Sequence, residues 1–117
     1  MENIYKKVST ALNEEVLGCR VQKIKRDANA RQSISYLLHP SIAIQHANDC
    51  VTLIEHEVQV DIWSDIELSI HELTNKVIKL MRDNGFMLIS VRSDIFESET
   101  NIIHKPVIFS YIENLRR

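Results

Sequence analysis

The chain has 117 residues and a mass of 13.6 kDa, which is the size of one domain with a single hydrophobic core. Its 44% hydrophobic and 26% charged residues are ordinary for a folded domain and argue against disorder. A formal net charge of −2 gives no general attraction to nucleic acid or to an anionic membrane, and two glycines are too few for a glycine-rich phosphate loop.

The N-terminal part of the chain predicts a helix followed by a short strand. Apolar residues recur at helical spacing over residues 2–17, and Gly18 supplies the left-handed residue that commonly follows a helix. A weak alternation predicts a strand over residues 19–24. The polar stretch 25–32 breaks that pattern and predicts a loop.

Two short β-like runs come next, at residues 33–38 and 42–46. His39 and Pro40 separate them, and a proline excludes one continuous central strand because it cannot donate to the hydrogen-bond ladder. Residues 47–49 predict a turn. We therefore expect two strands here.

The most regular pattern is a strict alternation over residues 51–63, which predicts a long, half-buried strand. One predicted face carries mostly apolar side chains, and the other carries polar ones together with a tryptophan. The first face is formed by Ile54, His56, Val58, Val60 and Ile62, and the second by Glu55, Glu57, Gln59, Asp61 and Trp63.

The pattern then changes to helical spacing, with apolar residues three and four apart up to Gly85. Ser64 and Glu67 have the spacing of a capping box, which predicts the start of this helix. Residues 86–96 predict a strand with Met87, Ile89, Val91 and Ile95 on one face.

A polar turn at 97–101 and a further strand over 102–112 complete an antiparallel hairpin. The order α-β-β-β-α-β-β predicts an α+β fold in residues 1–117 as a single domain. We expect a mostly antiparallel sheet with an N-terminal helix and one long central helix packed on it.

The charges are divided along the chain. Five basic residues and one acid lie between Arg20 and Arg31, whereas residues 32–75 contain seven acids and no Lys or Arg. Such a molecule can attract copies of itself head to tail, or the two sectors can be solvated faces of a monomer. The candidate interface residues are Arg20, Lys23, Lys25, Arg26, Arg31, Glu55, Glu57, Asp61 and Trp63.

Cys19 and Cys50 have no metal-ligand spacing, so we expect reduced, buried thiols. The N-terminus lacks the apolar stretch of a signal peptide, and no apolar run approaches the ~18 residues that span a bilayer. These features predict a soluble protein made in the cytoplasm, with no membrane partner.

Five histidines raise the question of a metal or catalytic site, but none forms the i, i+4 pair that holds zinc on a helix. Glu55, Glu57 and Asp61 can bind a cation or act as acid and base, or they can form the solvated side of a sheet. No partner base or metal motif accompanies them, so we predict no enzyme, no cofactor and no metal. The histidines are His39, His46, His56, His71 and His104.

The basic stretch has no interleaved aromatic residues on which bases could stack, so no specific nucleic-acid partner is expected. Trp63 lies at the end of the long predicted strand. It is interpreted either as packed under the following helix or as a contact for a partner chain.

The run from Val58 through "QVDIWS" to Ser64, a helix, Asn84-Gly85-Phe86, and a hairpin with residues 97–101 and His104-Lys105 resembles a known family. This family is the small tail-completion, or tail-to-head joining, proteins of long-tailed phages, which are akin to lambda-type tail terminators. The resemblance covers about half of the chain and does not extend over residues 25–49.

The resemblance implies a tail-terminator-like fold and a structural virion protein of a phage or prophage. Proteins of this family are monomers when made and assemble as a ring of six, which caps the tail tube and docks on the head connector. The implied partners are therefore further copies of the chain, the tail-tube protein and the head connector protein. A head-closure protein or tail-assembly adaptor is the alternative, and a small metal-dependent hydrolase is a remote one.

Overall fold

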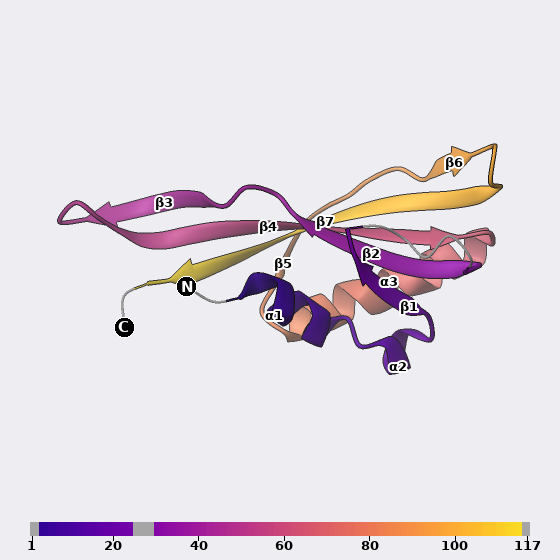
Figure 1. Ribbon diagram of the computed structural model, residues 1–117, viewed down its shortest axis with the longest axis horizontal. Coiled ribbons are helices and arrows are strands. Elements are labelled where there is room, and N and C mark those ends of the chain that lie inside the picture. The colour runs from indigo at the N-terminus through magenta and orange to yellow at the C-terminus, as the bar shows by residue number, and fades with distance from the viewer. Residues whose placement is uncertain (1–2, 25–29, 116–117) are drawn as a thin grey trace.

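The computed structural model describes residues 3–24 and 30–115 and has the predicted α+β architecture. Figure 1 shows the helices on one face of a long, twisted sheet, so the N-terminal and central helices are placed as expected. The elements in chain order are α1 (Ile4–Ala11), α2 (Glu14–Leu17), β1 (Arg20–Lys23), β2 (Gln32–Leu38), β3 (Ile42–Ala47), β4 (Cys50–Ser64), α3 (Glu67–Asp83), β5 (Met87–Val91), β6 (Ile95–Glu97) and β7 (Ile102–Asn114).

Two long strands, β4 and β7, form the centre of the sheet. They pair antiparallel from Leu53 opposite Asn114 to Ser64 opposite Ile103. β2 and β3 pair one after the other along the outer edge of β4, and β5 and β6 do the same along the outer edge of β7. β1 adds to β2 in parallel, while every other described strand pair is antiparallel.

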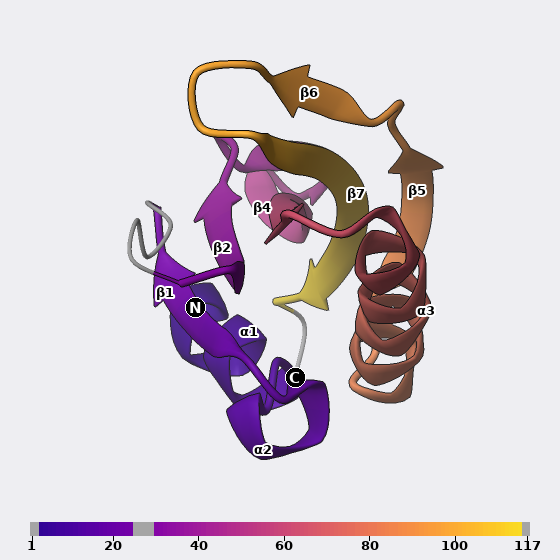
Figure 2. The same ribbon diagram turned by 90° about the vertical axis from the view of Figure 1, so that its right-hand side faces the viewer.

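The molecule is elongated, with extents of 53 × 26 × 20 Å. Two hairpins account for much of this length. In Figure 1 the hairpin of β3 and β4 projects at one end, and the hairpin of β6 and β7 projects at the other. Figure 2, viewed along the long axis, places α3 and β5 on one side and β1 and β2 on the other.

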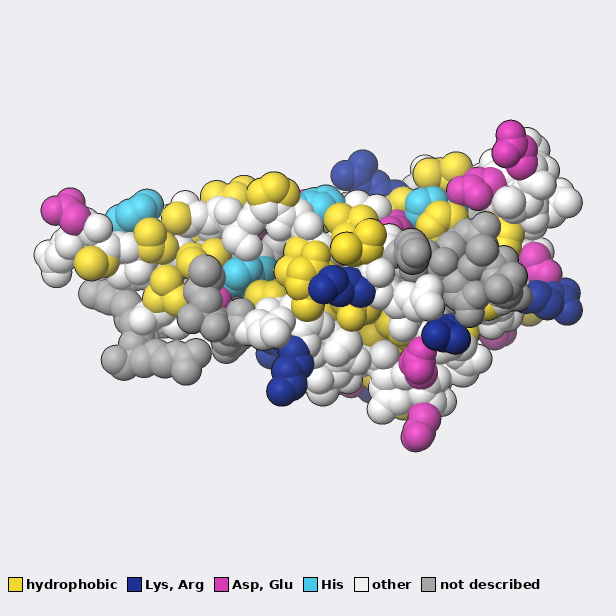
Figure 3. All heavy atoms as spheres, viewed as in Figure 1, with side chains coloured by type: hydrophobic (Ala, Val, Ile, Leu, Met, Phe, Trp, Pro, Cys, Tyr) yellow, Lys and Arg dark blue, Asp and Glu magenta, His cyan; other side chains and the backbone are white. Residues whose placement is uncertain are grey.

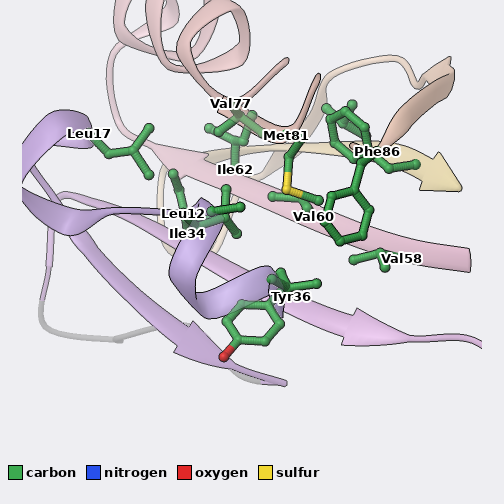
Figure 4. Close-up of a cluster of buried hydrophobic side chains, with 14 of the residues drawn as sticks. Leu12, Leu17, Ile34, Tyr36, Val58, Val60, Ile62, Val77, Met81 and Phe86 are labelled. Atoms are coloured by element: carbon green, nitrogen blue, oxygen red, sulfur yellow. The ribbon is translucent and has the colours of Figure 1, made fainter. Parts of the chain in front are cut away.

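The hydrophobic core lies between the helices and the face of the sheet that they cover. The predicted alternation of β4 is confirmed, because Val58, Val60 and Ile62 are fully buried in this core. They meet Val77 and Met81 of α3, Leu12 and Leu17 from the N-terminal segment, and Phe86 (Figure 4). On β7, Val107 and Phe109 lie opposite Val60 and Val58 and complete the layer.

The single helix expected over residues 2–17 is wrong, because the segment forms two helices separated at Leu12 and Asn13. The Asn13 side chain accepts a hydrogen bond from the Glu15 backbone N–H at 2.9 Å and so starts α2 as its N-cap. Gly18 ends α2 in the left-handed conformation, with φ 73°, as expected.

The predicted capping box at Ser64 and Glu67 is also wrong. Ser64 remains in the ladder as the last residue of β4, and α3 begins at Glu67 with Ile66 as its N-cap. The Ser64 hydroxyl accepts instead from the Ile66 backbone N–H at 3.1 Å, which stabilises the turn between strand and helix. A serine still engaged in a strand is not in position to cap the helix that follows.

The strand expected over residues 86–96 is two strands, β5 and β6, with a break at residues 92–94. The break lies beside Pro106 of β7, which has no N–H to offer a continuing strand. The Arg92 N–H donates to the Pro106 carbonyl at 2.9 Å and closes β5. A register shift between Leu88 and Ser90 also disrupts the single predicted face of this strand.

Substitution of one buried and one exposed valine tests the assignment of the core. Val58→Ala removes two methyl groups from a fully buried site and is expected to lower the free energy of unfolding by about 2–3 kcal/mol. Val16→Ala makes the same change on α2, where the valine is 52% exposed, and should cost less than about 0.5 kcal/mol. Urea unfolding followed by circular dichroism measures both. Equal losses would contradict the placement of the core.

Candidate assembly surfaces

The face of β4 and β7 that the helices do not cover, here called the helix-free face, carries a chain of hydrogen-bonded polar side chains. Trp63 Nε1 donates to Ser35 Oγ on β2 at 3.1 Å, and its indole stacks on the His104 imidazole with ring centroids 3.9 Å apart. His104 Nε2 lies 2.8 Å from Asp61 Oδ1, and Gln59 Nε2 donates to the same oxygen at 2.9 Å. This network, the polar ladder, joins β2, β4 and β7.

The polar ladder continues to the connection between β2 and β3. His39 follows β2 and lies 2.7 Å from Glu57 Oε1 through Nδ1 and 3.0 Å from Gln59 Oε1 through Nε2. The His39 backbone N–H donates to the Glu57 carbonyl at 2.9 Å. The start of the β3 hairpin is therefore fastened to β4 by both main chain and side chain.

A second histidine fastens the same connection from the helix-covered face. His56 Nε2 lies 2.8 Å from Glu113 Oε1 on β7, and Ser41 Oγ lies 2.8 Å from His56 Nδ1. The His56 and Glu113 side chains are only 4% and 2% exposed. The sequence placed His56 on the mostly apolar face of its strand, and it is buried there, whereas its Glu113 partner lies 57 positions away and gave no local signal.

The predicted acidic interface residues lie together on the helix-free face, but they are engaged within the chain. Glu57 contacts His39, and Glu55 accepts from Ser110 Oγ at 2.9 Å. Asp61 is buried beneath its contacts with His104 and Gln59, so the expectation of a solvated carboxylate is wrong there. Trp63 covers the β-sheet rather than packing under α3.

The predicted basic residues gather less closely. Arg20 and Lys23 lie exposed at the two ends of β1, and Lys23 Nζ lies 4.2 Å from the Tyr5 ring centroid. Arg31 pairs with Asp65 at 2.8 Å, just before α3. Lys25 and Arg26 lie outside the described residues. Their role in an interface stays a prediction.

Sequence reasoning missed an apolar surface along the outer strands β5 and β6. We expected Met87, Ile89, Val91 and Ile95 on one face of a strand, and all four are exposed. Burial at a sheet edge depends on what covers it, and α3 covers this edge only in part. We call the surface the β5–β6 margin, and it consists of Met87, Leu88, Ile89, Val91, Ile95 and Phe96.

A second apolar surface lies on the projecting hairpin. The β3 arm comprises β3 and the paired residues 50–55 of β4. Ile42 and Ile44 are 54% and 46% exposed, and β3 has no fully buried residue along its length. Figure 3 shows hydrophobic side chains along this arm and no Lys or Arg on it in that view.

Within the described residues, no group of three or more His, Cys, Asp and Glu side chains has the geometry to hold a metal ion. None of the described helices combines the length and the hydrophobicity needed to cross a membrane. Cys19 is half-buried, but Cys50 is exposed at the β3 arm, so the expectation that both thiols are buried is wrong for Cys50.

The sequence matches no protein-family model, and no curated protein is detectably similar. Among solved structures, a chain of the "Virion of native gene transfer agent (GTA) particle" shares the fold with a TM-score of 0.58. The alignment covers 92% of this chain and 88% of that one at 13% sequence identity. The likeness therefore extends over most of the chain and concerns the fold.

The Trp63–His104 stack has a direct spectroscopic test, since Trp63 is the only tryptophan in the chain. His104→Ala exposes one face of the indole and removes a partner of buried Asp61, so we expect an altered tryptophan emission and a loss of about 1–3 kcal/mol in unfolding free energy. His71→Ala on the exposed side of α3 is the control. Identical spectra for both variants would contradict the stack.

The two cysteines should differ in reactivity. Burial raises the pKa of the Cys19 thiol, the Glu14 carboxylate raises it further, and Lys76 acts weakly in the opposite direction. Because the thiolate is the nucleophile, Cys19 should alkylate more slowly than exposed Cys50 at neutral pH and should accelerate as the pH rises. Peptide mass mapping after timed alkylation measures this, with urea-unfolded protein as the control. Faster labelling of Cys19 would contradict its placement.

Proposed function

We propose that this chain is a structural protein of a phage or prophage virion that completes the tail and joins it to the head. The observation that carries the proposal is the fold likeness to a chain of a gene transfer agent virion over 92% of the residues. It agrees with the resemblance of "QVDIWS", Asn84-Gly85-Phe86 and the following hairpin to tail-completion proteins. The fold likeness and this local resemblance both favour a virion component.

In this role the chain acts as a subunit of a ring of six at the head–tail junction. One side of the ring caps the tail-tube protein, and the other docks on the head connector protein. The chain is made in the host cytoplasm as a monomer and joins the virion during assembly. The two hairpins that project at opposite ends of the subunit support this role, because they extend beyond the core and are available to neighbours.

The proposed role is not enzymatic. Its support is the way the chain uses its polar residues. Glu55, Glu57 and Asp61, the carboxylates that could have served chemistry, each hydrogen-bond to another side chain of the same chain. Such internal use stabilises strand register and leaves the surface to contacts with other proteins.

Removing the gene from the phage or prophage tests the proposal. Without the protein, we expect full heads and tubes that fail to join, with tails of irregular length by electron microscopy. Supplying the wild-type chain in trans should restore joined particles. Normal-length tails attached to heads in the absence of the protein would refute the role. Normal-length, finished tails beside heads that leak DNA would instead identify the head-closure or adaptor alternative.

A further inference from the structure

The β5–β6 margin has an exposed strand edge that is rich in apolar side chains. Soluble proteins blunt such edges with Lys, Pro or a covering element, because an unpaired edge is a template for pairing with another chain. β5 has the sequence Met-Leu-Ile-Ser-Val and pairs, among the described strands, only with β7. Phe96 of β6 is 61% exposed. A strand partner would bury this edge.

The β3 arm has the same property on the opposite side of the sheet. β3 pairs with β4 alone among the described strands, and its outer edge is apolar at Ile42 and Ile44. A hairpin of this kind gains little stability by itself in water. The contacts of His39 and Ser41 at its start hold it in a defined direction, so it is preorganised for docking.

The two surfaces differ in charge and share an apolar strand edge. Residues 32–75 contain no Lys or Arg, and Asp49 is exposed at the tip of the arm. The margin is mixed in charge: Arg92 is exposed at the end of β5, Asp94 pairs with Lys105 at 2.7 Å, and Glu97 lies in β6. Arg92 therefore offers the acidic arm one opposite charge, and the apolar side chains of the two edges supply the larger part of the contact.

One chain cannot bring its own two surfaces together. β3 lies on the outer edge of β4 and β5 on the outer edge of β7, with both central strands between them. A second copy offers each surface the partner that it lacks, and repetition of this head-to-tail contact closes a ring. A groove of about 330 Å³ lies between α3 and the margin and can receive side chains of the arriving strand. Apolar Ile70, Ile78 and Val91 line it together with polar and charged residues, which include Asp94 and Lys105.

We propose that the β3 arm of one copy docks on the β5–β6 margin of the next copy and extends its sheet by a strand. The occupant of the margin is therefore a second copy of this chain. The inference rests on the proposed function for the expectation of a ring. It adds the two surfaces through which neighbouring subunits of that ring make contact.

Cross-linking between two differently marked chains tests the contact. One chain carries Cys19→Ala and keeps Cys50 on the arm, and the other carries Cys19→Ala, Cys50→Ser and Ser93→Cys beside the margin. A flexible bis-maleimide added to the concentrated mixture should give a covalent dimer that neither chain gives alone. No dimer in the mixture, or as much dimer from either chain alone, would overturn the proposal.

Charge substitutions then test the surfaces themselves. Ile44→Lys in the Cys50 chain should lower the dimer yield about tenfold or more, because a desolvated lysine opposes docking on the margin. Ile89→Glu in the Ser93→Cys chain should recover most of that yield. Val16→Lys, on an equally exposed residue of α2, is the matched control and should leave it unchanged. Unchanged yield with Ile44→Lys, or no recovery with Ile89→Glu, would overturn the proposed contact.

These outcomes separate the contact from the role. If the mixed dimer fails to form but removal of the gene still leaves heads and tails unjoined, the contact is wrong and the role stands. If the mixed dimer forms as expected but particles assemble normally without the protein, the contact stands and the role is wrong.

Discussion

The antiparallel pairing of β4 with β7 is the interaction on which the rest of the structure depends. It runs without interruption from Leu53–Asn114 to Ser64–Ile103, and every other described strand attaches directly or through β2 to one of these two. The same pair supplies the floor of the core through Val58, Val60, Val107 and Phe109. Because each central strand is longer than its neighbours, two shorter strands share each outer edge and the hairpin ends extend past the core.

The local sequence pattern predicts the structure of this chain well where the alternation of a strand alone decides which side chains are buried. The alternation of β4 placed its apolar side chains on the core face, and Gly18 ended the N-terminal helical segment. The pattern failed where contacts with another element decide where a strand or helix begins or ends. Pro106, on a different strand, sets the break between β5 and β6, and the ladder position of Ser64 removes it from the helix cap. Neither effect is visible in a window of local sequence.

The candidate surfaces were likewise predictable from the sequence only in part. The alternating carboxylates of β4 were found from the sequence, but their partners His39, Ser110 and His104 come from other parts of the chain. Those contacts turn a predicted charged surface into an internal network. The exposed surfaces are instead apolar and lie on hairpins. A run such as Met87–Val91 predicts burial, and only the position of α3 shows that its side chains are exposed in this chain.

The central pair also bears on how the chain folds. β4 and β7 are separated in sequence by the whole of α3 and the β5–β6 segment. Pairing the two strands therefore closes a long loop, and the entropy cost of that closure comes before the contacts of the ladder stabilise the fold. Chains dominated by such distant contacts fold slowly. During synthesis, β4 leaves the ribosome well before its partner. A nascent chain therefore carries β4 with the edge that faces β7 unpaired for the time needed to make about 40–50 further residues, several seconds at ribosomal rates.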